Sequence, residues 1–178
     1  MRILGIDPGF GTLGWAVIGD GLKLVDCGAI VSAPGGELSY RLLKIYRELD
    51  EIISKHSPSV LAMERLYFAK NATTAMDVGK CIGVVLLSAG MRGLACTEYT
   101  PLQVKRAVTG HGKATKRQVQ IMVGGLYGMK KPPSPDDAAD ALAVATCHYL
   151  ASSGAGAAFA ERTPDARSGR QGSDDSAD

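Results

Sequence analysis

Short apolar runs alternate with longer segments of helical periodicity along most of the chain. Two such runs, Ile3–Ile6 and Trp15–Ile18, flank a glycine-rich turn and predict a β-hairpin. A third run, Leu22–Val31, follows the tight turn Gly19-Asp20-Gly21. We therefore expect the chain to begin with an antiparallel meander of three strands.

The next segments predict helices and strands in turn. Leu38–His56 places its apolar side chains on one helical face and is stopped by Ser57-Pro58. Val60–Glu64 is nearly all apolar, which is typical of a central strand covered by helices on both faces. Leu94–Glu98 predicts a further strand. This succession indicates an α/β fold.

A long segment rich in small residues, Thr73–Met91, has helical character and few charges. Such a helix is either central in the core or packs one side against a second copy of the chain. We favour the second reading, which predicts a homodimer. Three further helices are expected at Leu102–Val108 (after a Thr100-Pro101 cap), at Thr115–Leu126, and from Pro135 to His148 with Ser134 as its cap.

The end of the chain lacks any periodicity. Gly, Ala, Ser, Arg and Asp dominate residues 153–178, a composition that buries too little apolar surface to fold. We expect one domain over residues 1–152 and a disordered tail over 153–178.

Composition narrows the class of protein. The chain has 178 residues, of which 46% are hydrophobic, enough for the core of one domain. No apolar run approaches the roughly 18–20 residues that span a bilayer, and the start lacks the apolar stretch of a signal peptide. The four cysteines form no C-x-x-C pair, so we expect buried free thiols and a cytoplasmic protein.

Positive charge is concentrated in one part of the chain. No Asp or Glu occurs between Glu98 and Asp136. Seven cations fall in that interval: Lys105, Arg106, Lys113, Lys116, Arg117, Lys130 and Lys131. Lys116 and Arg117 would oppose the dipole of their helix, as expected where an anion sits nearby. The stretch therefore favours a polyanionic partner such as nucleic acid.

Acidic residues occur where chemistry would need them. Asp7 and Glu64 each end an apolar strand, and functional groups in open α/β sheets gather at such ends. Asp137 and Asp140 are three residues apart on one face of the last helix, whereas capping of that helix suffices to explain Asp136. Taken alone, Asp7 also suits an ordinary hairpin turn. The four acids together favour a shared site.

Carboxylates without His or Cys suit Mg²⁺ or Mn²⁺ rather than Zn²⁺. Two such ions would activate water and stabilise the leaving oxygen in phosphodiester hydrolysis. Acids at the centre with cations around them therefore suggest a metal-dependent nuclease acting on a phosphodiester backbone.

The sequence resembles the RuvC family of Holliday-junction resolvases, within the ribonuclease H-like superfamily. The resemblance rests on four segments in the family's order, extending over nearly all of residues 1–150: Gly5-Ile6-Asp7-Pro8-Gly9, Met63-Glu64 with Ala69-Lys70-Asn71-Ala72, Val104-Lys105, and Asp137-Ala138-Ala139-Asp140-Ala141-Leu142-Ala143. It implies a mixed five-stranded sheet of order 3-2-1-4-5 flanked by helices. It also implies a homodimer that nicks a four-way DNA junction symmetrically, leaving 5′-phosphate and 3′-hydroxyl ends, with RuvA and RuvB as partners.

The resemblance assigns roles by position. Asp7, Glu64, Asp137 and Asp140 fall on the metal-binding catalytic carboxylates, while Lys105 and Lys116 fall where the family places cations beside the scissile phosphate. We expect Lys116 to offset charge on that phosphate. Tyr67 corresponds to an aromatic residue that stacks on an unpaired base. The other residues expected to contact DNA are Arg65, Lys70, Arg106, Lys113 and Arg117.

Three other functions compete with this one. The hexokinase and actin superfamily shares the Asp-x-Gly hairpin but needs a second similar domain, for which 178 residues leave no room. The shorter YqgF-type family of RNA-processing nucleases shares the sheet, but the basic stretch and the Asp-Ala-Ala-Asp helix disfavour it. A junction-binding protein without catalysis would gain affinity by losing the four acids.

Overall fold

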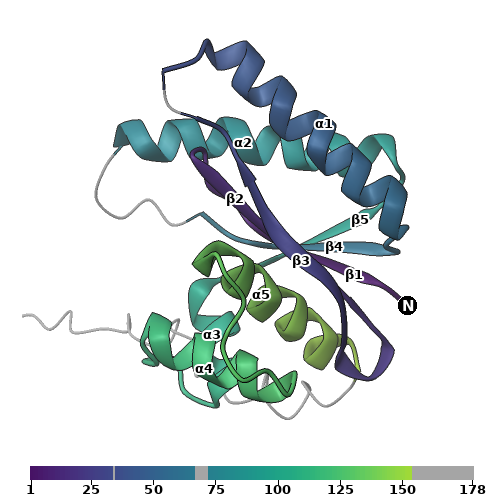
Figure 1. Cartoon of the computed structure of the whole chain (residues 1–178), viewed down its shortest axis with the longest axis vertical. Coiled ribbons are helices and arrows are strands. Elements are labelled where there is room, and N and C mark those ends of the chain that lie inside the picture. Colours follow the sequence, from purple (N-terminus) through teal and green to yellow (C-terminus); the bar gives the residue numbers. More distant parts are fainter. Residues whose placement is uncertain (34, 67–71, 154–178) are drawn as a thin grey trace, which may run out of the picture.

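A computed structural model describes residues 1–33, 35–66 and 72–153 of the chain. A single five-stranded sheet lies between two layers of helices (Figure 1). The strands are β1 (Ile3–Asp7), β2 (Thr12–Gly19), β3 (Lys23–Val31), β4 (Val60–Glu64) and β5 (Ala95–Tyr99), with a short 3-10 turn, η1 (Asp20–Leu22), between β2 and β3. The helices are α1 (Leu38–His56), α2 (Ala72–Met91), α3 (Pro101–Thr109), α4 (Lys116–Leu126) and α5 (Asp136–Ser152).

The strand order is β3-β2-β1-β4-β5, which confirms the expected 3-2-1-4-5 arrangement. β1, β2 and β3 pair antiparallel, whereas β4 runs parallel to β1 and β5 parallel to β4. The first three strands follow one another through tight connections, while β4 and β5 are each reached through a helix that crosses one face of the sheet. The carboxyl ends of β1, β4 and β5 therefore lie at the same end of the sheet.

Alternation of side chains along β1 and β4 divides the core into two parts. Leu4, Ile6, Leu61 and Met63 point to the face that α1 and α2 cover. Ile3, Val60 and Ala62 point to the face that α3, α4 and α5 cover. Because side chains change face at every residue, Asp7 and Glu64 fall on the α5 face at the ends of adjacent strands.

Helix α5 is the most buried helix, because nearly all of its central residues are enclosed. Gly5 of β1 makes this possible, since a methyl group there would overlap the carbonyl oxygen of Ala141 and the side chain of Ala145. Small residues on both sides thus bring α5 against β1. The contact sets the distance between the acids of the helix and Asp7 at the strand end.

Several sequence-based expectations need correction. Helix α5 begins at Asp136 with Pro135 as its cap, one residue later than predicted, and Ser134 does not cap it. Of the four free cysteines, Cys81 and Cys147 are buried as expected, whereas Cys27 is half-buried and Cys96 is exposed. Cys96 is exposed because β5 forms an edge of the sheet. The predicted tail lies, from residue 154 on, outside the described residues.

Candidate active site

The site is a hollow of about 350 Å³ at the edge where β1 and β4 end. Asp7 and Glu64 line it from the strands, Asp140 lines it from α5, and Lys105 and Lys116 line it from α3 and α4. The remaining lining is apolar except for backbone: Pro101, Val104, Val119 and Ala143. The structure thus brings three of the four predicted acids together with two of the predicted cations.

Asp137 lies one turn before Asp140 but does not line the hollow. Its charge is nevertheless close enough to raise the pKa of both Asp7 and Asp140. Gly14 of β2, which pairs with Asp7, admits the start of α5, because a methyl group there would overlap the backbone oxygen of Asp137. Asp137 therefore belongs to the same acidic cluster.

Nearby positive charge does not fully compensate the carboxylates of the acidic cluster. Burial, together with the neighbouring charges of Glu64, Asp140 and Asp137, raises the pKa of Asp7 to about 7. Burial and the charge of Asp140 likewise raise the pKa of Glu64, while burial raises that of Asp140. A cluster of this kind is stabilised by any cation that enters it.

Lys116 supplies part of that charge. Its Nζ lies 2.7 Å from Oδ2 of Asp140, and hydrogen bonding to Asp140 raises the pKa of the lysine. The position of Lys116 follows from a capping box, in which Thr115 and Gln118 exchange hydrogen bonds around the start of α4. A cation in the first helical turn, unfavourable by itself, is thus balanced by an acid of α5.

The oxygen-only donor set fits a hard divalent cation. In residues 1–33, 35–66 and 72–153, however, no three Asp, Glu, His or Cys side chains converge tightly enough to constitute a preformed metal site. The carboxylates repel one another, and Asp140 pairs with Lys116 at 2.7 Å. Binding an ion would therefore draw side chains together that now stand apart.

The family model described as crossover junction endodeoxyribonuclease RuvC matches residues 3–148. This chain belongs to the RuvC family. A RuvC from Caldicellulosiruptor saccharolyticus is 48% identical over 157 residues, covering 86% of this chain and 95% of that protein. The Thermus thermophilus RuvC structure matches with a TM-score of 0.79 and 34% identity, over 86% of this chain and 96% of the other. The same protein in complex with Holliday junction substrate matches with a TM-score of 0.79 and 31% identity, over 86% and 95%.

The remaining residues predicted to contact DNA fall in three groups. Tyr67 and Lys70 lie outside the described residues. Arg65 is half-exposed, and its Nε donates to Glu98 at 3.2 Å, so a carboxylate already holds it beside the site. Arg106 is half-buried, whereas Lys113 and Arg117 are exposed. Their contacts with DNA stay predictions.

Asp136 has a larger part than the sequence suggested. Its charge raises the pKa of Lys116 and of Asp140, so it adds to the field of the site besides favouring the start of α5. In the sequence, only its position directly before Asp137 indicated that Asp136 would lie near the acidic cluster.

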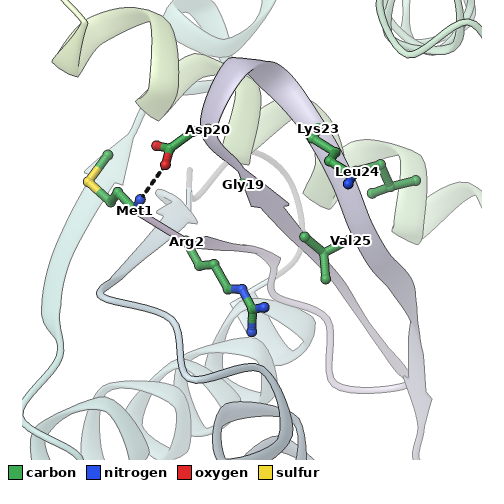
Figure 2. A pocket seen from close by; sticks show the side chains of 7 residues that line it. All are labelled: Met1, Arg2, Gly19, Asp20, Lys23, Leu24 and Val25. Atoms are coloured by element: carbon green, nitrogen blue, oxygen red, sulfur yellow. Dashed lines mark hydrogen bonds and ion pairs between the residues drawn. The ribbon is translucent and has the colours of Figure 1, made fainter.

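A second hollow, of about 510 Å³, lies at the other end of the first strands (Figure 2). Met1, Arg2, Gly19, Asp20, Lys23, Leu24 and Val25 line it, and the amino group of Met1 pairs with Asp20 at 2.8 Å. This hollow is larger, yet it holds one acid that is already paired. Chemistry rather than volume therefore makes the hollow at Asp7 the candidate active site of this chain.

Proposed function

We propose that this chain is a crossover junction endodeoxyribonuclease that resolves four-way DNA junctions by metal-dependent hydrolysis. Membership of the RuvC family carries the activity. The single structural observation that supports it is the convergence of Asp7, Glu64 and Asp140 with Lys105 and Lys116 in one hollow. An acidic centre with lysines at its rim suits a phosphodiester whose charge the acids alone would repel.

Asp7, Glu64, Asp137 and Asp140 would hold two Mg²⁺ or Mn²⁺ ions. When bound, such ions activate water and stabilise the charge of a phosphodiester under attack. Lys116 would leave Asp140 as the acids take up cations and would then be free to face the scissile phosphate. Lys105, which lines the same hollow, would bind the DNA phosphate backbone next to the scissile phosphate.

The test is a cleavage assay on an end-labelled mobile four-way junction in Mg²⁺ or Mn²⁺, with linear duplex and structured RNA beside it. Paired symmetric nicks on the junction, with 5′-phosphate and 3′-hydroxyl ends, are the expected result. Binding without nicks in either metal would indicate a junction-binding protein. Preferential cutting of RNA would indicate the RNA-processing alternative.

We further propose that the protein acts as a homodimer through the outer face of α2. Met76, Leu87 and Met91 are 64%, 60% and 64% exposed on this helix, where the two charged residues, Asp77 and Lys80, pair with each other at 2.7 Å. Gly79, Gly83 and Gly90 lie on the same side, and none has an atom within 4 Å of an added methyl group. Large apolar side chains beside small residues allow a second helix to approach closely. Contacts with the RuvA and RuvB proteins stay predictions, and so does a cytoplasmic location. Among the described residues, no helix is long and apolar enough to cross a membrane.

Leu87→Glu should convert the dimer into a monomer, because it places a charge in the centre of this apolar face. Light scattering after size-exclusion chromatography measures the change. Ile121→Glu is the matched control, since Ile121 is 54% exposed on α4, away from the proposed interface. A Leu87→Glu protein with an unchanged mass would contradict the assignment of this face.

A further inference from the structure

An arginine at the start of α1 reaches back to the turn that follows Asp7. The guanidinium carbon of Arg41 lies 3.7 Å from the centroid of the Phe10 ring, in a cation–π contact. Its Nη2 donates to three acceptors: the backbone oxygen of Phe10 at 3.3 Å, the backbone oxygen of Ser32 at 3.1 Å and Oγ of Ser32 at 3.1 Å. One side chain thus joins the β1–β2 turn to the end of β3.

Ser32 completes the same connection from the other side. The residue is 1% exposed and directly follows β3. Its Oγ donates to the backbone oxygen of Phe10, and its backbone N–H donates to the backbone oxygen of Gly11 at 2.9 Å. The carbonyl of Phe10 therefore accepts from both Arg41 and Ser32. We refer to Phe10, Ser32 and Arg41 as the turn clamp.

The turn clamp holds the part of the chain where the sheet ladder stops. The register of β1 with β4 ends at the pair Ile6–Met63, and the register of β1 with β2 ends at Asp7–Gly14. Asp7 is thus the last residue of its strand, three positions before Phe10. The turn at Phe10 sets how the chain leaves β1, and with it the direction in which the Asp7 carboxylate enters the site.

We propose that Arg41 is a positioning residue for Asp7, acting through the turn clamp. Arg41 does not line the site hollow, so its effect reaches the carboxylate through the backbone. The inference rests on the proposed function, in which Asp7 binds the catalytic metal. An arginine suits this role because its planar fork stacks on a ring while donating to several oxygens, which a lysine ammonium does not do.

The test compares Arg41→Met with Arg47→Met in the full-length protein. Arg47 is exposed on the same helix and serves as the matched control. We expect Arg41→Met to weaken Mn²⁺ binding by about threefold to tenfold, as measured by titration calorimetry without DNA. Single-turnover cutting should slow by at least about tenfold, because small displacements of a catalytic group are costly. The Kd for the junction should stay unchanged, and Arg47→Met should behave as the wild type.

Two further variants separate positioning from general stability. Ser32→Ala should slow cutting less than Arg41→Met, and the double variant should be no slower than Arg41→Met alone, because both substitutions open one clamp. Arg41→Lys should restore part of the Mn²⁺ affinity. If Arg41→Met fails to fold, Arg41→Lys replaces it in every comparison, with losses in the same direction but smaller.

The outcomes distinguish this inference from the proposed function. If the wild type cuts junctions while Arg41→Met, folded at the assay temperature, binds Mn²⁺ and cuts as the wild type does, Arg41 is a structural residue only. A lowered Tm with unchanged Mn²⁺ affinity and cutting rate leads to the same conclusion. If the wild type itself leaves junctions intact, the proposed function fails instead, and Mn²⁺ binding alone then decides on the clamp.

Discussion

Asp7→Asn should reduce junction cutting by more than about 100-fold while leaving junction binding intact. Asp7 lies at the centre of the acidic cluster, where Glu64, Asp140 and Asp137 all act on its pKa. An amide keeps the shape of the side chain but is a poorer ligand for a hard cation. Single-turnover rates in Mg²⁺ and Mn²⁺ measure the loss, and a gel-shift assay in EDTA measures binding.

Asp20→Asn is the control for this experiment. Asp20 is also an aspartate near a strand end, but its side chain is 80% exposed and pairs with the amino terminus. We expect this variant to cut at the wild-type rate. Cutting by Asp7→Asn near that rate would instead remove the metal-binding role from Asp7.

The same variant should stabilise the metal-free protein, in a manner that depends on pH. The pKa of Asp7 is raised from 3.8 to about 7, so the folded state keeps a proton that the unfolded state has released. The unfolded state therefore binds fewer protons between pH 4 and 7, and the free energy of unfolding falls as pH rises through this range. The Asp7→Asn variant does not lose this free energy of unfolding, because an amide does not titrate in this range. In EDTA at pH 8 its free energy of unfolding should exceed that of the wild type by on the order of 1–4 kcal/mol, which a higher Tm would report, and the difference should disappear toward pH 4.

Much of the arrangement around Asp7 could be predicted from the order of residues. Apolar strands that each end in an acid placed Asp7 and Glu64 correctly, because parallel strands bring their carboxyl ends to one edge. The α5 face also follows from alternation, since Ile3 and Val60 share it with Asp7 and Glu64. The spacing of Asp137 and Asp140 indicated a common helical face in the same way.

Other features depend on contacts that periodicity does not encode. The sequence left open whether α2 is central in the core or packs against a second copy of the chain, and it is the packing against Gly5 that shows α5 in the core. The pairing of Lys116 with Asp140 joins α4 to α5 across the site, so no local pattern predicts it. The turn clamp likewise joins three separated segments through Arg41, which reads in the sequence as an ordinary polar position of an amphipathic helix.

Gly14→Ala tests the packing that brings the last helix to the catalytic strand. Gly14 pairs with Asp7 across the hairpin and is buried, and a methyl group there would overlap the backbone oxygen of Asp137. Backbone cannot rotate away as a long side chain can. The start of α5 would therefore move outward, carrying Asp137 away from Asp7.

We expect Gly14→Ala to lower the free energy of unfolding by about 1–3 kcal/mol, the usual cost of overpacking a core. It should also slow cutting by at least about tenfold where the protein is still folded, because an acid of the cluster is displaced.

Gly125→Ala is the control, and we expect it to change stability in the opposite direction. That glycine is exposed on α4 with nothing within 4 Å of an added methyl group, so alanine should stabilise the helix by about 0.5–1 kcal/mol. Chemical denaturation and single-turnover cutting measure both variants, and a Gly14→Ala protein as stable and as fast as the wild type would show that α5 tolerates a shift of its first turn without consequence for the site.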